Sequence, residues 1–172
     1  MEALRIGISV QEHAHLPAAL CPHFLTVSMD TVDPMVFKQL RGGASVGKVL
    51  RNVTEFHKTC PTVRMGFITT VTKLNIGLID PLIDAGLEAG VAVFNLRQVI
   101  HNPDSPVIDH SAVSDLTVPD AAFADVVARV QGKYGHVTRF CIQEASGMRI
   151  LGNSVRTQSM LPGEAELARI GI

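Results

Sequence analysis

A serine, an aspartate and an arginine cluster around one predicted strand–helix junction, and their types suit ligand binding. The strand 24–28 is short, apolar and rich in β-branched residues, and it runs into Ser28-Met29-Asp30. The helix that follows ends near Arg41. A guanidinium group matches a carboxylate through two parallel hydrogen bonds. Ser28, Asp30 and Arg41 are therefore the first candidates for a binding site.

The position of these residues in the chain favours the same interpretation. Asp33-Pro34 predicts a helix start, with a carboxylate at the N-cap and proline at the first helical position. A strand followed at once by a helix places Ser28 and Asp30 at the carboxyl end of a strand, where α/β folds bind ligands. A purely structural alternative stays open, in which Asp30 caps the turn into the helix and pairs with Arg41.

A second group of candidates is a set of histidines near the N-terminus. His13 and His15 follow a predicted strand at a spacing of two, and His23 follows Cys21-Pro22. Two histidines so spaced after a strand can reach one metal ion in hydrolases with a TIM barrel, and the ion would activate water. The alternative is a solvated loop with incidental histidines.

The cysteines give a different indication. Cys21, Cys60 and Cys141 are too far apart for a CxxC-type metal site or a cluster-binding loop. A sparse, odd set of cysteines is typical of buried thiols in a reducing compartment. We therefore expect no resident metal held by cysteine.

Alternating and helical patterns predict the elements that must position these residues. The pattern is β-α-β-α-β-α-β followed by a looser C-terminal part, and the crossovers are long enough for parallel pairing. Predicted strands are 4–10, 24–28, 63–71, 91–96, 136–142 and 148–151, and predicted helices begin at Asp33, at Ala44, at the cap pair Asp80-Pro81 and at Val118. A further short helix is predicted over 164–170.

These elements predict an α/β fold, namely a partial (β/α) barrel of about five mainly parallel strands with outer helices. One domain over 1–152 is followed by a tail over 153–172. The segment 97–118 shows no periodicity and is longer than ordinary connections. We interpret it as a functional loop or a mobile segment.

Composition narrows the classes of partner. The 172 residues are 47% hydrophobic and 18% charged, with a net charge of −1, which gives no electrostatic attraction to nucleic acid or to a membrane surface. The apolar runs are shorter than the roughly 20 residues that a membrane helix needs. The first 20 residues lack the basic start and apolar core of a signal peptide. We expect a cytoplasmic protein with no nucleic-acid or membrane partner.

The order of motifs resembles that of a known family. The segment 27–53, VSMDTVDPMVFKQLRGGASVGKVLRNV, resembles the middle of a radical S-adenosylmethionine (SAM) enzyme. In that family a strand ending in Ser-x-Asp runs into a helix with Arg-Gly near its end, and a helix carrying asparagine follows, as Asn52 does here. The resemblance continues through TVTKLN, which ends at Asn75, and covers roughly residues 4–102.

The resemblance implies a SAM site and its residues. The serine of the motif helps to hold the amino-acid end of SAM, and an arginine can serve its carboxylate, which points to Ser28, Asp30 and Arg41. Thr70, in the threonine-rich end of the strand 63–71, belongs to the same expected site. Family members often carry Thr-Asn-Gly after the strand before Ser-x-Asp; Ser9-Val10-Gln11-Glu12 stands there in this chain, so Gln11 or Glu12 is the candidate for the ribose contact.

The resemblance also implies an activity and a missing part. Family members cleave SAM reductively at a [4Fe–4S] cluster to give a 5′-deoxyadenosyl radical, and the cluster is held by CxxxCxxC. This sequence contains no such cysteine triplet, so we expect no cluster and no activity of the chain alone. Three explanations stay open: a truncated product, a non-catalytic binding or scaffold relative, and half of a split enzyme. Catalytic residues are not identified.

The first predicted strand indicates where a partner would bind. The strand runs from Leu4 to Val10, and Arg5 is its one charged residue. An apolar strand at the edge of a sheet recruits another chain or is covered by its own chain. We expect self-association or a partner chain along this strand, or coverage by the tail 153–172.

Overall fold

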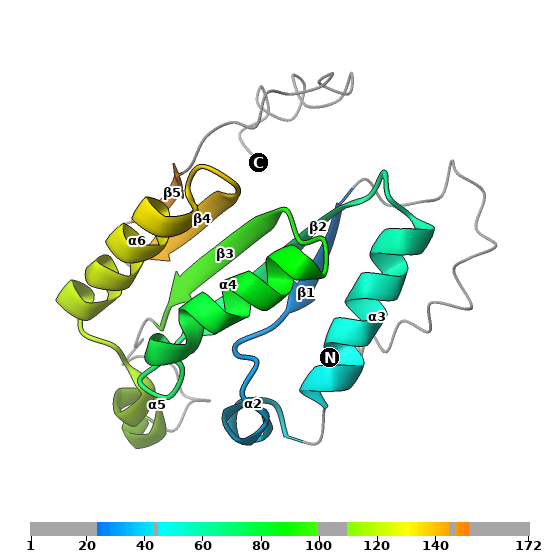
Figure 1. Ribbon diagram of the computed structural model, residues 1–172. Helices are drawn as coiled ribbons and strands as arrows, with labels where there is room; N and C mark the ends of the chain where they lie inside the picture. The colour runs from blue at the N-terminus through cyan, green and yellow to red at the C-terminus, as the bar shows by residue number, and fades with distance from the viewer. Residues whose placement is uncertain (1–23, 43–44, 100–109, 145–146, 152–172) are drawn as a thin grey trace.

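The computed structural model describes residues 24–42, 45–99, 110–144 and 147–151, which form an α/β unit (Figure 1). Its sheet has five strands in the order β1-β2-β3-β4-β5. They are β1 (Phe24–Ser28), β2 (Arg64–Val71), β3 (Val93–Gln98), β4 (Arg139–Glu144) and β5 (Gly147–Leu151). The first four strands are parallel to one another, and β5 is antiparallel to β4.

Helices connect the parallel strands. They are α2 (Pro34–Arg41), α3 (Val46–Thr59), the 3-10 helix η2 (Ile76–Leu78), α4 (Ile79–Glu88), α5 (His110–Leu116) and α6 (Asp120–Tyr134). Asp33 caps α2, because its Oδ1 accepts hydrogen bonds from the backbone N–H of Met35 and Val36 at 2.8 and 2.9 Å. In the part of the chain described here, no helix has the length and apolar character needed to cross a membrane.

The strand order determines where the helices lie. Spatial order equals chain order from β1 to β4, so each crossover moves the chain one strand in the same direction. Right-handed crossovers that all run one way place their helices on one face of the sheet. Figure 1 shows α3, α4 and α6 on the same side of the sheet, with α2 and α5 beyond the carboxyl ends of the strands. A doubly wound sheet would instead reverse its order at a switch point.

A row of aromatic rings forms the centre of the core beneath α4. Phe67, Phe94 and Phe140 are neighbours in register on β2, β3 and β4, and all three are fully buried. Ring centroids lie 5.9 Å apart for the first pair and 6.0 Å apart for the second. Gly86 of α4 sits directly on two of these rings, so the helix can approach the sheet closely only because this residue has no side chain.

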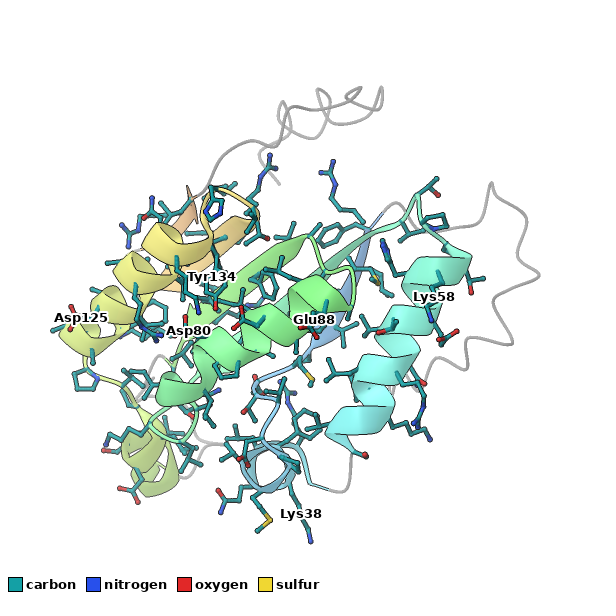
Figure 2. The ribbon with its side chains drawn as sticks, viewed as in Figure 1. Lys38, Lys58, Asp80, Glu88, Asp125 and Tyr134 are labelled. Carbon is teal, nitrogen blue, oxygen red and sulfur yellow. The ribbon has the colours of Figure 1, made fainter. Side chains whose placement is uncertain are left out.

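Polar and charged side chains either join α4 to α6 or lie on the outer surfaces of the helices. Tyr134 of α6 donates a hydrogen bond to the backbone carbonyl of Asp80 in α4, and Arg129 forms an ion pair with the Asp80 carboxylate. Figure 2 shows Tyr134 and Asp80 side by side between the two helices, whereas Lys58 and Asp125 lie on outer helix surfaces. The helices α4 and α6 are therefore bonded to each other as well as packed on the sheet.

Most elements predicted from sequence patterns are confirmed. The five strands within the described ranges occur where they are predicted, with ends shifted by up to three residues, and the apolar stripe of α3 packs inward through Val46, Val53 and Phe56. The predicted strand 4–10, the helix 164–170 and the tail 153–172 lie outside the described residues, so the partner edge stays a prediction.

Two local predictions are wrong. Asp80-Pro81 does not begin a helix: α4 starts at Ile79 after the N-cap residue Leu78, and Asp80 lies in its first turn. The preceding turn forms η2. The segment 97–118 is not all loop, because β3 continues to Gln98 by pairing with Val71, and α5 occupies its end.

Replacing Gly86 by alanine tests the close packing of α4. A Cβ atom at Gly86 would lie 2.7 Å from Phe94 and 3.0 Å from Phe67, both fixed in the core, so we expect a loss of about 1–3 kcal/mol in the free energy of unfolding. Gly132→Ala in α6 is the matched control, because that glycine is exposed and has open space around it. Helix propensity predicts that the free energy of unfolding of the control, measured by urea denaturation, rises by up to about 1 kcal/mol. Equal effects of the two variants would show that the packing is looser than described.

Candidate functional site at the carboxyl end of the parallel strands

The residues Ser28-Met29-Asp30 leave β1 in alternating directions. Met29 is fully buried in the core, and its N–H donates to the carbonyl of Ile68 at 2.9 Å, which extends the pairing of β1 with β2 by one residue. Ser28 and Asp30 therefore lie on the opposite face of the sheet from the core, at its carboxyl edge. Local strand alternation is enough to place these two side chains together.

Asp30 is a buried carboxylate with both oxygens in use. Its Oδ1 accepts a hydrogen bond from the N–H of Thr70 at 2.9 Å, and its Oδ2 accepts one from Nε of Arg41 at 2.5 Å. The side chain is only 6% exposed, so the ion pair with Arg41 meets most of the cost of burying its charge. Asp30 thus fastens β1 to β2 and holds Arg41 in one orientation.

Arg41 is the accessible member of this group. Its Nη2 donates to Oγ of Ser28 at 2.5 Å, and its side chain is 33% exposed. Two of the five guanidinium N–H groups are accounted for by Asp30 and Ser28, which leaves three for a ligand. Ser28 is exposed, and because its oxygen accepts from Arg41, its own O–H is left to donate.

Asn75 closes the same edge from the other side. It is fully buried, its amide nitrogen donates to the carbonyls of Asp30 and Thr70 at 2.8 and 2.9 Å, and its Oδ1 accepts from the N–H and the hydroxyl of Thr72 at 2.7 and 3.1 Å. Every hydrogen-bonding position of the side-chain amide is occupied. Thr69 adds a bond from its hydroxyl to the carbonyl of Met29 at 2.7 Å.

The structure thus brings together four of the predicted binding residues: Ser28, Asp30, Arg41 and Thr70. The ion pair expected in the structural alternative is present, but Asp30 does not cap α2, since Asp33 does. Gln11, His13, His15 and His23 lie outside the described residues, so the predicted ribose contact and the alternative metal site stay predictions. The sequence does not predict the role of Asn75; the one local signal is its position directly after a threonine-rich strand end, in TVTKLN.

The cysteines that the structure describes are separated. Cys60 follows α3 and precedes β2, on the amino side of the sheet, whereas Cys141 is in the middle of β4. Burial raises the pKa of the Cys141 thiol, and the nearby charge of Arg139 offsets part of that effect. Within residues 24–42, 45–99, 110–144 and 147–151, no three histidine, cysteine or acidic side chains are grouped as a metal site.

The arrangement suits binding more than acid–base chemistry. The one carboxylate among the four predicted binding residues is buried and fully engaged, while the accessible groups are hydroxyl and guanidinium donors. Donors of this kind hold a carboxylate or a phosphate group.

No family model matches the sequence, and no curated protein matches it.

Replacing Asn75 by alanine tests whether the edge depends on this clamp. The change removes four hydrogen bonds in a fully buried position and strands two carbonyls, so we expect a loss of about 2–4 kcal/mol in the free energy of unfolding, measured by urea denaturation. Asn52→Ala on α3 is the control, since that half-buried asparagine is in a helix, and we expect it to be neutral or slightly stabilising. A loss below about 1 kcal/mol for Asn75→Ala would contradict the assigned role.

Proposed function

We propose that this chain is the C-terminal part of a radical SAM-type domain, with the finer architecture of a partial (β/α) barrel. The observation that carries the proposal is the convergence of Ser28, Arg41 and Thr70 at the carboxyl edge of consecutive parallel strands, held by Asp30. The strand order supports a barrel-type arrangement, because it keeps the helices on one face and leaves the other face for ligands.

In this proposal the accessible donors receive the amino-acid end of SAM. Arg41 offers its remaining N–H groups to the carboxylate, and the hydroxyl of Ser28 donates beside it. Asp30 acts as a positioning residue, since its oxygens face Arg41 and Thr70 and its burial keeps it from the ligand. The negative charge of Asp30 also offsets the positive charge of Arg41, so we expect SAM to bind weakly.

The chain is proposed to bind SAM without cleaving it. In this family a [4Fe–4S] cluster supplies the electron for cleavage, and the sequence lacks the cysteine triplet that would hold one. Anaerobic reconstitution with iron and sulfide, with and without added cellular protein, separates the remaining explanations. Uptake of a cluster only with a second chain would identify half of a split enzyme.

Calorimetry with SAM tests the proposed pocket. We expect weak binding that Arg41→Met reduces roughly tenfold or more, because one charge-assisted contact is lost. Ser28→Ala, which leaves the pair of Asp30 and Arg41 intact, is expected to weaken binding to a smaller degree. Arg51→Met, on the exposed surface of α3, is the control and is expected to bind as the parent does. Tight binding that Arg41→Met leaves unchanged would show that the pocket lies elsewhere.

A further inference from the structure

A second positively charged group lies on the same face of the sheet, two strands from Ser28. Arg97 is in β3, where it pairs in register with Thr70 of β2 and with Gln143 of β4. Residues paired in register in a parallel sheet share one face. Thr70, Arg97 and Gln143 therefore form a row across three strands at the carboxyl edge, about 10 Å from β1 at two strand spacings.

Arg97 has unmet hydrogen-bonding capacity. Its side chain is half-buried, its Nε is shielded from solvent, and that atom has no hydrogen-bond partner. Among the residues that the structure describes, no carboxylate forms an ion pair with Arg97. Oδ1 of Asn95, one pleat earlier on the same face of β3, is also buried and without a partner. Partly buried arginines are normally paired, so a guanidinium in this state favours an anionic ligand.

The neighbours of Arg97 fit the same ligand chemistry. Thr70 contributes a hydroxyl and Gln143 an amide, both half-buried, and both flank the guanidinium at about one strand spacing, roughly 4.8 Å. On this face, the alternating positions Ile68 to Thr70, Asn95 to Arg97 and Cys141 to Gln143 of β2, β3 and β4 carry no aspartate or glutamate, and Arg97 is their one charged residue. The local charge therefore favours an anion over a cation.

We propose that Arg97, flanked by Thr70 and Gln143, binds the carboxylate or phosphate group of a small ligand. The site is centred on Arg97 and shares only Thr70 with the site of Arg41; the charge of Arg41 is offset by Asp30, whereas no described carboxylate forms an ion pair with Arg97. The proposal does not depend on SAM binding. If SAM and a second ligand bind at this edge of the sheet together, we predict that the second ligand carries a carboxylate or phosphate group.

Thermal unfolding in the presence of simple anions tests the site. Inorganic phosphate and malonate are the probes, and sodium chloride at equal ionic strength is the reference that removes general screening. We expect one probe or both to raise the melting temperature of the parent chain in a saturable way, since a ligand bound to the native state alone stabilises it. A response to phosphate alone would assign a phosphate-bearing ligand, and a response to malonate alone a carboxylate.

Variants of Arg97 separate binding from a structural role. Arg97→Met is expected to remove the part of the response that is due to this site, at least tenfold in affinity, while being at least as stable as the parent without anion, because it removes an unpaired, partly buried charge. Arg97→Lys keeps the charge and is expected to weaken the affinity about tenfold through loss of the two-point contact. Arg139→Met, on the same face about 13 Å away at four residues along a strand, is the control and keeps the response.

The opposite results would overturn the proposal. No saturable response of the parent to either anion, or a response whose size and midpoint Arg97→Met leaves unchanged, contradicts an anion site at Arg97. A marked loss of stability in Arg97→Met without anion would show that Arg97 serves the fold. Because no SAM is used, these results neither support nor contradict the proposed SAM pocket. If calorimetry contradicts the SAM pocket, the results for Arg97 still hold.

Discussion

The buried carboxylate of Asp30 is the constraint on which the carboxyl edge of the sheet depends. A charge that is almost closed to water must be met by hydrogen bonds, and here Arg41 and the N–H of Thr70 meet it from two different elements. The same carboxylate thereby fixes the end of β1 against β2 and the end of α2 against the sheet. Asn75 completes the edge by binding the carbonyls of Asp30 and Thr70. Ser28 and Arg41 face solvent only because this frame holds them.

The division of the sheet into two faces follows from its connections. Consecutive parallel strands send every crossover in one direction, so α3, α4 and α6 and the aromatic row beneath α4 occupy one face. The other face carries Thr70, Arg97 and Gln143 in register across β2, β3 and β4. Both proposed ligand sites therefore lie on this face at the carboxyl edge, where strands of this kind commonly place ligands.

Local signals in the sequence were sufficient for the elements but not for the contacts between them. Strand alternation and the stripe of α3 depend on neighbouring residues, and so does the cap at Asp33; all three were predicted correctly. The segment containing α5 has the sequence pattern of a loop, because its seven mainly small and polar residues form no apolar stripe. The cap pair Asp80-Pro81 misled because η2 runs directly into α4 and moves the start to Ile79. Asn75 binds a carbonyl 45 residues away. The sequence predicts a loop at Arg97 because the apolar run ends at Leu96, but pairing with β2 extends β3 to Gln98. Such long-range partners have no local pattern.

A double-mutant cycle between Asp30 and Arg41 measures the central interaction most directly. The free energy of unfolding would be determined by urea denaturation for the parent, Asp30→Ala, Arg41→Met and the double variant. If Asp30 is held by Arg41, the two single changes are strongly non-additive, with a coupling energy of at least about 1 kcal/mol. Arg41→Met is destabilising because it leaves the buried carboxylate of Asp30 without its cation, and Asp30→Ala is destabilising because it leaves the N–H of Thr70 without an acceptor. A coupling energy near zero would show that the carboxylate and the guanidinium act independently, and it would contradict this account of the carboxyl edge.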